Sequence, residues 1–385
     1  MKRAIGPMAL AVLGAFSVHW LVWGSFEGFT NSIDFNAGAL EDFMGPYLEM
    51  ARIVQDGTRT PAVQGFVYTP FFAWLISPLG SIDPGTASWI WLGVQVLSIL
   101  ALLLLPLRLV RNLSMHERAV FVFATLVAFP LAHNLHWGQV STPLWALALL
   151  AVGFLQQGRV HRAACVLGLA GAIKFFPWAL ALIFPMRRQV RPLLSAGAVG
   201  LVFAVGVPLL VFGLAFTVDI YDFSFDQVEA NLQGAWDGSP NRQDLAQVLG
   251  RWTGLEDAGR WLQALALLGF AGAVWCGQRV ARRAGELDTA RAFAILTCGL
   301  LLALPPGWPH YFVHLPFVQL VAWRTRCDRL DGGLVLASAA LASVVPMAFV
   351  DSYDVYTGSG ALAVANVLVL VALVRGSAAD ADPES

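Results

Sequence analysis

The sequence predicts an all-α integral membrane protein that crosses the bilayer many times. Of its 385 residues, 57% are hydrophobic and only 13% are charged, and the mean hydropathy is +0.66. A soluble protein carries about 25% charged residues. Apolar segments recur along the chain and are separated by clusters of arginine. This pattern is typical of polytopic helical proteins, whose basic residues mark the cytoplasmic ends of the spans.

The overall charge and the cysteines argue against several kinds of site. The net charge is −1 and the pI is near 6.6, which argues against nucleic acid as a partner, because binding it requires a basic surface. The cysteines have no CxxC spacing and lie in or beside apolar segments, so we interpret them as small core residues. They are Cys165, Cys276, Cys298 and Cys327.

The first apolar stretch, residues 4–23, follows Lys2 and Arg3 as the core of a signal peptide would. It has no small-x-small cleavage site, and Trp20 and Trp23 are typical interface anchors. We therefore expect this stretch to remain in the protein as the first span, starting from the cytoplasm.

Span length and the positions of the basic turns predict about ten full spans, with both termini in the cytoplasm. The spans are expected near residues 4–23, 88–107, 119–135, 140–155, 193–216, 261–277, 292–306, 311–323, 334–350 and 361–374. We find no internal repeat and treat residues 1–376 as one transmembrane domain with large outer loops at 25–87 and 217–258. The acidic tail, residues 377–385, is expected to be disordered and cytoplasmic.

Segment 163–185 breaks this alternation. It is long enough to cross, yet basic clusters flank both of its ends, and Lys174 and Pro177 interrupt its middle. One interpretation is a re-entrant hairpin of two half-helices, because irregular backbone at membrane depth is tolerated where it is buried in protein or lines a cavity. The alternative is one ordinary span whose lysine snorkels to the cytoplasmic face.

The polar segments that lack basic anchors all fall on the non-cytoplasmic side of this topology. They are residues 25–85, 133–139, 217–257, 305–310 and 351–357. These segments carry the acids, histidines and amides that chemistry requires, so we expect a site that faces outward.

Glu41 and Asp42 are adjacent acids in the first outer loop. A carboxylate there can act as a general base if its surroundings keep it partly dry, because desolvation raises its pKa toward the working range. The alternatives are a solvated loop acid or, for Asp42, the N-cap of a short helix.

Two cationic or titratable side chains lie near membrane boundaries. Lys174 is inside an apolar run, where a charge is costly and by default functional, and a phosphate would suit it as a partner. His310 lies in the motif PPGWPHYF at the outer mouth of a span. An imidazole held among three prolines can hydrogen-bond a phosphate or move a proton.

Two further motifs are open to two interpretations. HNLHWGQ places His136 and Gln139 beside a tryptophan, which suits either sugar hydroxyls or an interfacial belt. In SPNRQ, the residues Asn241, Arg242 and Gln243 can bind a polar substrate or form a turn and an N-cap. No Walker, zinc or Rossmann spacing is present, and we expect neither a metal nor a cofactor.

The motifs form a specific series when they are taken in chain order. They are Asp-Phe before a Tyr at 42–47, Tyr-x-Pro-Phe at 68–71, Asn-x-x-x-Gly-Gln at 134–139, Ile-Lys-Phe-Phe-Pro at 173–177, Asn-x-Gln at 241–243 and Trp-Pro-His-Tyr at 308–311. This order, spread over about residues 34–325, resembles the bacterial polyprenyl-phosphate-sugar-dependent glycosyltransferases of family 87, which include actinobacterial mannosyltransferases.

The resemblance implies a GT-C architecture, which is a membrane helical bundle with a cavity open to the outer leaflet of the bacterial cell membrane. Such enzymes transfer a hexose from a polyprenyl-phosphate donor to a hydroxyl of a lipid or glycan acceptor, with inversion. Mannose is the hexose that the resemblance implies. Membrane lipids are the expected surroundings, and the lipid phosphate supplies the activation.

The resemblance also implies roles for individual residues. The acid of the first outer loop acts as the base, which here is Asp42, with Glu41 as an additional neighbour. His310 is assigned to the donor phosphate, and Lys174 or Arg242 would add positive charge there. The other motif residues are expected to contact substrate: Tyr68, His136, Gln139, Asn241, Gln243, Trp308 and Tyr311.

Two other functions were weighed against this one. A transporter or lipid flippase without bond chemistry would show internal repeats and charges at the membrane midplane, and the sequence offers Lys174 but no repeat. A membrane acyl- or phosphotransferase would need an acid–histidine motif such as HxxxxD, and no acid follows His314 at that spacing. A glycosyltransferase therefore fits the sequence best.

Overall fold

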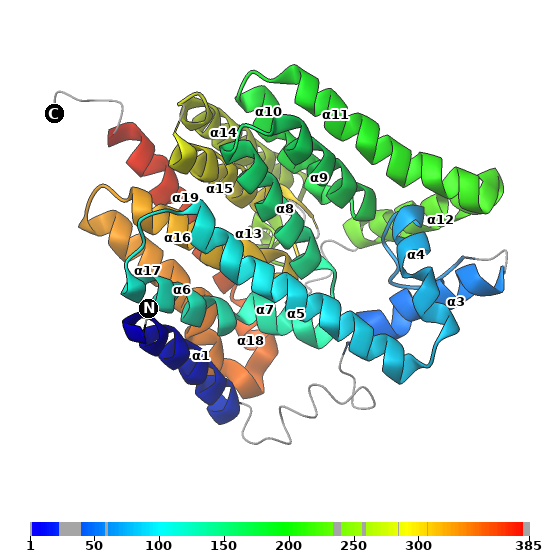
Figure 1. Ribbon diagram of the computed structural model, residues 1–385, viewed down its shortest axis with the longest axis horizontal. Helices are drawn as coiled ribbons and strands as arrows, with labels where there is room; N and C mark the ends of the chain where they lie inside the picture. Colours follow the sequence, from blue (N-terminus) through cyan, green and yellow to red (C-terminus); the bar gives the residue numbers. More distant parts are fainter. Residues whose placement is uncertain are drawn as a thin grey trace.

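The computed structural model describes residues 2–22, 40–57, 61–233, 240–255, 259–283, 285–305 and 307–379. Every regular element in these residues is helical (Figure 1), which confirms the all-α class. Parts of several predicted features lie outside the described residues: Trp23, 25–39 of the first outer loop, 234–239 and 256–258 of the second, and 380–385 of the tail. The last helix continues to Ala379 and so includes the first residues of the predicted tail.

Helices follow one another along the whole described chain. Its first half contains α1 (Lys2–Val22), the π-helix η1 (Phe43–Tyr47), α3 (Leu48–Asp56), α4 (Pro70–Ile76), the 3-10 helix η2 (Ser77–Ser81), α5 (Pro84–Leu109), α6 (Met115–Leu126), α7 (Phe129–Trp137), α8 (Ser141–Gln156), α9 (Val160–Ile173), the 3-10 helix η3 (Phe176–Leu182) and α10 (Ile183–Met186). Its second half contains α11 (Val190–Leu201), the π-helix η4 (Val202–Gly206), α12 (Val207–Gln233), α13 (Leu245–Thr253), α14 (Gly259–Ala281), α15 (Glu286–Ala303), the 3-10 helix η7 (Pro309–His314), α16 (Leu315–Thr325), α17 (Arg329–Ser343), the 3-10 helix η8 (Val345–Ser352), α18 (Tyr353–Gly358) and α19 (Ala361–Ala379).

Helices α5 and α6 begin at side-chain caps. Ser114 Oγ accepts a hydrogen bond from Glu117 N (3.2 Å), and Glu117 Oε2 accepts one from Ser114 N (2.8 Å), a capping box that starts α6. Asp83 Oδ2 accepts a hydrogen bond from Thr86 N (2.9 Å), and Pro84 opens α5. Each cap contributes about 1 kcal/mol, so these starts are set by local sequence.

Helix α15 is the centre of the core. Residues 289–303 of this helix are all buried, and α14, α19, α8 and α16 pack around it. A helix that is apolar on every side must be covered on every side.

Among the cysteines only Cys298, in α15, is buried, whereas Cys165 and Cys327 are exposed and Cys276 is intermediate. The prediction that all four are core residues is therefore wrong for three of them.

Four of the described helices are long and apolar enough to cross a bilayer: Pro84–Leu109, Val190–Ala230, Gly259–Ala281 and Arg329–Phe349. The pair Met115–Leu126 and Phe129–Trp137, bent by 40°, would make a fifth span. Shorter apolar helices lie at Gly6–Val18, Ser141–Gln156, Val160–Ile173, Phe176–Met186 and Ala361–Gly376. The total of about ten spans remains a prediction.

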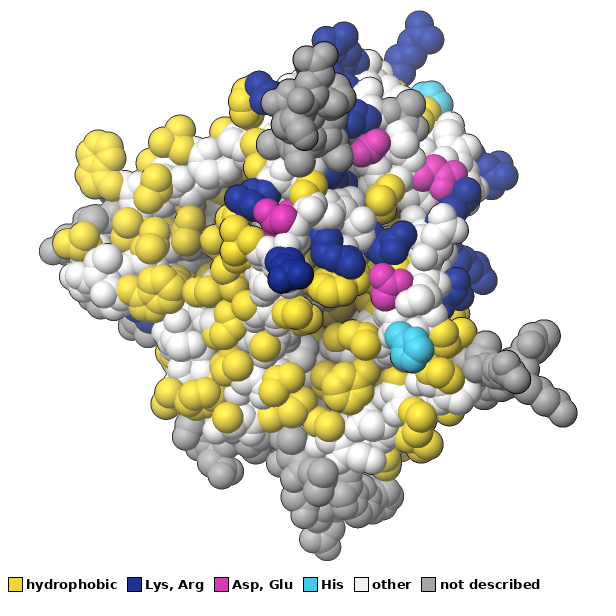
Figure 2. Space-filling model, turned by 90° about the vertical axis from the view of Figure 1, so that its left-hand side faces the viewer, with side chains coloured by type: hydrophobic (Ala, Val, Ile, Leu, Met, Phe, Trp, Pro, Cys, Tyr) yellow, Lys and Arg dark blue, Asp and Glu magenta, His cyan; other side chains and the backbone are white. Residues whose placement is uncertain are grey.

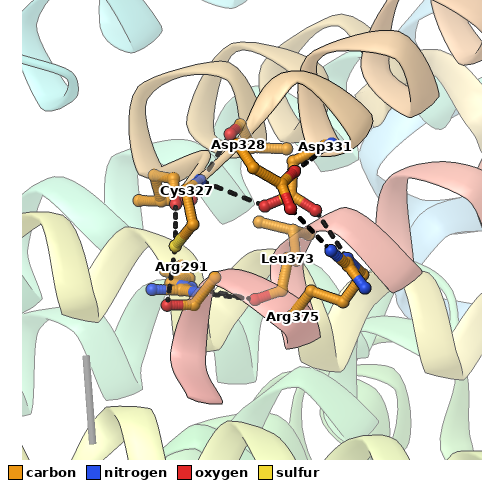
Figure 3. A network of polar contacts seen from close by, with 9 residues as sticks. Arg291, Cys327, Asp328, Asp331, Leu373 and Arg375 are labelled. Carbon is orange, nitrogen blue, oxygen red and sulfur yellow. Dashed lines mark hydrogen bonds and ion pairs between the residues drawn. The ribbon is translucent and has the colours of Figure 1, made fainter. Parts of the chain in front are cut away.

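The basic turns meet at one end of the molecule. Ion pairs join turns that are far apart in sequence: Arg111 with Glu286, Arg324 with Glu117, and Arg375 with Asp328 and Asp331. Figure 2, which views the left-hand side of Figure 1, shows Arg, Asp and Glu gathered beside a broad hydrophobic surface. Figure 3 shows Arg375 beside the two aspartates at the start of α17, with Arg291 directed at the carbonyl of Leu373. The charged side chains at this end therefore pair with one another across the turns.

Segment 160–186 starts and finishes at this same end. Before it, Gln156 Nε2 donates a hydrogen bond to Glu286 O (2.9 Å), and after it, Arg187 Nη1 donates one to Thr289 Oγ1 (2.6 Å). Glu286 and Thr289 lie in the first turns of α15. Between these flanks α9 stops at Ile173, because Lys174 has extended backbone angles (φ −144°, ψ 140°), and η3 leads back.

Trp178 of η3 is wedged between α9 and α11. A Cβ atom at Gly171 of α9 would overlap its indole ring, and one at Gly200 of α11 would lie 2.5 Å from its Nε1. Small residues let helices approach closely in membranes, and here they make room for a tryptophan that fixes the position of η3 behind Lys174.

Replacing Gly171 with Ala is expected to lower the free energy of unfolding by about 1–3 kcal/mol, because overpacking displaces the tryptophan. Thermal unfolding of the detergent-solubilised protein measures this loss as a lower Tm. The matched control is Gly197→Ala in α11, where a Cβ atom meets nothing within 4 Å; it should keep the wild-type Tm or raise it. Equal Tm values for the two variants would show that Trp178 is not held by this packing.

Candidate active site

Asp42 lies at the entrance of η1, and its carboxylate is directed into the protein. Its side chain makes no capping hydrogen bond, so the N-cap interpretation is wrong. Instead Asp42 Oδ2 accepts a short hydrogen bond from Gln139 Nε2. Asp42 is only partly exposed, whereas the neighbouring Glu41 is exposed to solvent. The two adjacent acids therefore have different surroundings.

Burial raises the pKa of Asp42 from its ordinary value near 4 to about 6. The hydrogen bond from Gln139 and the positive charge of Lys174 oppose this rise, and the charge of Glu41 adds slightly to it. At neutral pH the carboxylate is therefore ionised but basic enough to accept a proton, which is the balance that a general base requires.

Gln139 connects Asp42 to a pair of tyrosines. Its Oε1 lies within hydrogen-bond distance of Tyr68 Oη (2.9 Å) and Tyr47 Oη (3.1 Å), and the two hydroxyl oxygens are in contact with each other. Both tyrosines are almost completely buried. One amide side chain thus orients a carboxylate and two phenols.

Lys174 joins the cluster from the break after α9. Its Nζ donates a hydrogen bond to Tyr68 Oη (3.2 Å) and lies over the rings of Tyr68 (4.5 Å) and Tyr311 (4.7 Å). Thr69 fixes the break, because its Oγ1 donates a hydrogen bond to Ala172 O at the end of α9. A buried ammonium flanked by aromatic faces is stabilised by cation–π attraction, and it is ready for an anionic partner.

Helix α12 holds the loop that carries Tyr68. Ser224 Oγ donates hydrogen bonds to Phe66 O (3.2 Å) and Tyr68 O (3.1 Å), and Gln227 Nε2 donates to Val63 O (3.3 Å). Segment 217–257 was predicted as an outer loop, but its first part is helical and clamps the first outer loop.

His310 lies in η7, next to Tyr311, and is 4% exposed. Its ring centroid is 4.8 Å from that of Tyr311 and 5.4 Å from that of His133. Neither ring nitrogen has a hydrogen-bond partner among the described residues. Burial holds the pKa of His310 well below its usual range, so the imidazole is neutral and can donate one hydrogen bond to a ligand.

The motif at 241–243 forms a neighbouring cluster around Gly307. Gln243 N donates a hydrogen bond to Gly307 O (2.7 Å), and Gly307 N donates one to Asp244 Oδ2 (3.2 Å). Arg242 Nη2 pairs with Asp244 Oδ2 at 3.3 Å, and both side chains are buried. A Cβ atom at Gly307 would lie 2.7 Å from Asp244 N. This cluster fixes the start of the loop that carries His310.

The structure therefore separates the predicted site residues into a centre and a periphery. Side-chain contacts link one set continuously: Asp42, Gln139, Tyr68, Lys174, Tyr311 and His310. The second set lies around it: exposed Glu41 and His136, and the loop residues Asn241, Arg242, Gln243 and Trp308. The sequence analysis did not include Tyr47 among the site residues, although Tyr47 closes the motif at 42–47.

Comparisons of the sequence with known proteins identify the family of the chain. The model of glycosyltransferase family 87 matches residues 66–305, which is more than half of the chain. Two curated relatives share the name polyprenol-phosphate-mannose-dependent alpha-(1-2)-phosphatidylinositol mannoside mannosyltransferase. The Mycobacterium tuberculosis protein is 29% identical over 304 residues and the Mycolicibacterium smegmatis protein 26% identical over 301 residues.

The aligned region covers 74% of this chain and 66% of the length of each relative. No solved structure matches the chain. The family match nevertheless extends from the Tyr68 motif almost to the loop of His310. The chain belongs to glycosyltransferase family 87.

Proposed function

We propose that the protein transfers mannose, or a closely related hexose, from a polyprenyl-phosphate-linked donor to a hydroxyl of a lipid or glycan acceptor, with inversion. Family membership and the names of the two relatives support this class of donor. The observation that carries the proposal is the pairing of a basic carboxylate, Asp42, with a buried ammonium, Lys174, across Gln139 and Tyr68.

The proposed reaction is a single displacement. The acceptor oxygen attacks the anomeric carbon of the sugar, and its proton passes to the carboxylate of Asp42. The bond between the anomeric carbon and the phosphate oxygen breaks, and its electron pair remains on the polyprenyl phosphate. Lys174 and the neutral imidazole of His310 stabilise the charge that develops there. One displacement at the anomeric carbon inverts its configuration.

The acceptor is proposed to be a mannosylated phospholipid, because both relatives are named for phosphatidylinositol mannoside. Exposed His136 and the loop at 241–243 are proposed to meet it at the outer edge of the site. Asp42, Gln139 and the tyrosines lie deeper, where a hydroxyl can approach the base.

The proposed setting is a GT-C bundle of about ten spans in the bacterial cell membrane, with the site toward the periplasmic or extracellular side. Asp42 bonds Gln139 just before α8, whereas Gln156 at the other end of α8 bonds Glu286, the partner of Arg111 in a basic turn, which supports this orientation. The shared contacts of both flanks of segment 160–186 with α15 support a re-entrant hairpin that brings Lys174 to the site.

The test supplies purified protein in lipid nanodiscs with polyprenyl-phosphate mannose labelled in the sugar and a phosphatidylinositol mannoside acceptor. We expect labelled acceptor lipid in one step, and none when GDP-mannose replaces the lipid donor. A flippase would instead move the donor between leaflets of vesicles without forming a glycosidic bond. Absence of product with several mannosylated and unmannosylated acceptors would contradict the proposal.

A further inference from the structure

Two side chains of α5 donate hydrogen bonds to the backbone of the turn that carries Gln139. Trp91 Nε1 donates a hydrogen bond to Gly138 O (2.7 Å), and Gln95 Nε2 donates one to Gln139 O (2.7 Å). Gly138 has φ +64°, and a Cβ atom there would lie 3.0 Å from Cβ of Phe43 and 3.1 Å from Cβ of Leu40. The turn is therefore pressed against the segment that carries Asp42 and cannot move away without losing these bonds.

Gln95 itself is fixed by two further helices. Its Oε1 accepts hydrogen bonds from Asn134 Nδ2 of α7 (3.0 Å) and from Thr142 Oγ1 of α8. Asn134 Nδ2 also donates to Thr142 Oγ1 (3.1 Å), and Asn134 O accepts a hydrogen bond from Gln139 N (3.0 Å). Gln95, Asn134 and Thr142 are fully buried. We call these three residues the amide relay.

We propose that the amide relay positions Gln139, and through Gln139 the base Asp42, so that Gln95 and Thr142 are positioning residues for transfer. The inference rests on the proposed function, since it assigns the relay to the base of that reaction. Neither Gln95 nor Thr142 reaches the substrate side of the site; they act on the backbone of Gln139, whose side chain holds Asp42, Tyr47 and Tyr68.

The energetic argument starts from the backbone carbonyl of Gln139, a buried acceptor to which Gln95 Nε2 donates. Without the amide of Gln95, the carbonyl of Gln139 loses its donor in an apolar interior, which costs about 1–3 kcal/mol and leaves the turn free to rotate. A displacement of about 1 Å at a reacting group can cost about 10²-fold in rate. Loss of the relay should therefore reduce the turnover more than the affinity.

The pKa of Asp42 provides a second measurable quantity. The hydrogen bond from Gln139 lowers the pKa of Asp42, against the larger effect of burial. The other charged or titratable groups that act on Asp42 or respond to it are Lys174, Glu41, Tyr47, Tyr68 and Tyr311. None of these is bonded to the relay in the described part of the chain except through Gln139. Breaking the relay should therefore move the acid limb of the kcat/KM profile to higher pH.

The experiment compares Gln95→Met, Thr142→Val and Thr142→Ser in full-length protein, using polyprenyl-phosphate mannose and a phosphatidylinositol mannoside as substrates. We expect Gln95→Met and Thr142→Val to lower kcat about 10- to 100-fold with little change in the donor KM. The acid limb should lie at higher pH than in the wild-type protein, where we expect the pKa of Asp42, about 6, to set it. Thr142→Ser keeps the hydroxyl and should restore both values.

The matched control is Gln319→Met. Gln319 is also a buried glutamine, and its Nε2 donates a hydrogen bond to Ser338 Oγ (2.9 Å) between α16 and α17, outside the relay. It should lose a comparable amount of thermal stability while kcat and the acid limb stay at wild-type values. If Gln95→Met behaves like Gln319→Met, the relay is only structural and the inference is overturned.

The variants of Thr142 and Asp42 distinguish failure of this inference from failure of the proposed function. If Gln95→Met does not fold, the pair Thr142→Val and Thr142→Ser decides, because each changes the side chain by little in volume. If Asp42→Asn transfers mannose like wild type in the same assay, Asp42 is not the base and both proposals fail. If Asp42→Asn is inactive while Thr142→Val keeps kcat and its acid limb, only the relay is refuted.

Discussion

Asp42→Asn is expected to lower the rate of mannosyl transfer by about 10²–10⁴-fold, the contribution typical of a general base. Asparagine has nearly the same shape and can still accept the hydrogen bond from Gln139 Nε2, but it cannot take the proton of the acceptor hydroxyl. Burial raises the pKa of Asp42, so its negative charge opposes folding and the variant should keep its Tm. Single-turnover assays with labelled donor measure the chemical step directly.

Glu41→Gln is the control for this experiment. Glu41 is the next residue in the chain, yet it is exposed and has only a weak effect on the pKa of Asp42. It should transfer mannose at close to the wild-type rate. An inactive Glu41→Gln together with an active Asp42→Asn would assign the base to Glu41 and would remove the basis for the mechanism above.

The sequence could predict which segments meet because charge and hydropathy fix the direction of each span. Asp42, Gln139 and His310 come from three segments without basic anchors, which the topology places on one side. Lys174 comes from a segment with basic clusters at both ends, for which a re-entrant hairpin was one of two interpretations. The structure brings these four residues into one cluster. Their chemical roles remain predictions, because contact alone does not measure rate.

The hydrogen-bond partners of polar side chains inside the membrane could not be predicted from charge and hydropathy. Gln95 is one polar residue in the 26-residue helix α5, and its main partner is a backbone carbonyl 44 positions away. Hydropathy identifies the span but not the direction in which one side chain points. The contact of Arg242 with Asp244, only two positions away, was likewise not predicted from the sequence.

Lys174→Met is expected to lower kcat/KM by about 10²–10³-fold, the loss found when one group that stabilises developing charge is removed. Lys174 is 7% exposed, and none of the ion pairs found in the described residues includes it. Its charge is therefore buried without a direct ion pair in the described part of the chain, although the charge of Asp42 acts on it from farther away, and the leaving phosphate would supply a direct partner. Methionine fills a similar space without the charge, so the variant isolates the electrostatic contribution.

Values of Tm, measured with and without a phosphate ligand, distinguish loss of the charge of Lys174 from destabilisation of the fold. Replacing a buried charge with an apolar side chain is often neutral or stabilising, so Lys174→Met should keep or raise its Tm. A short-chain prenyl phosphate should raise the Tm of the wild-type protein, because a ligand that binds only the folded state stabilises it. It should have little effect on Lys174→Met. Equal stabilisation of both proteins, with equal kcat/KM, would show that Lys174 does not bind the phosphate and would leave His310 as its ligand.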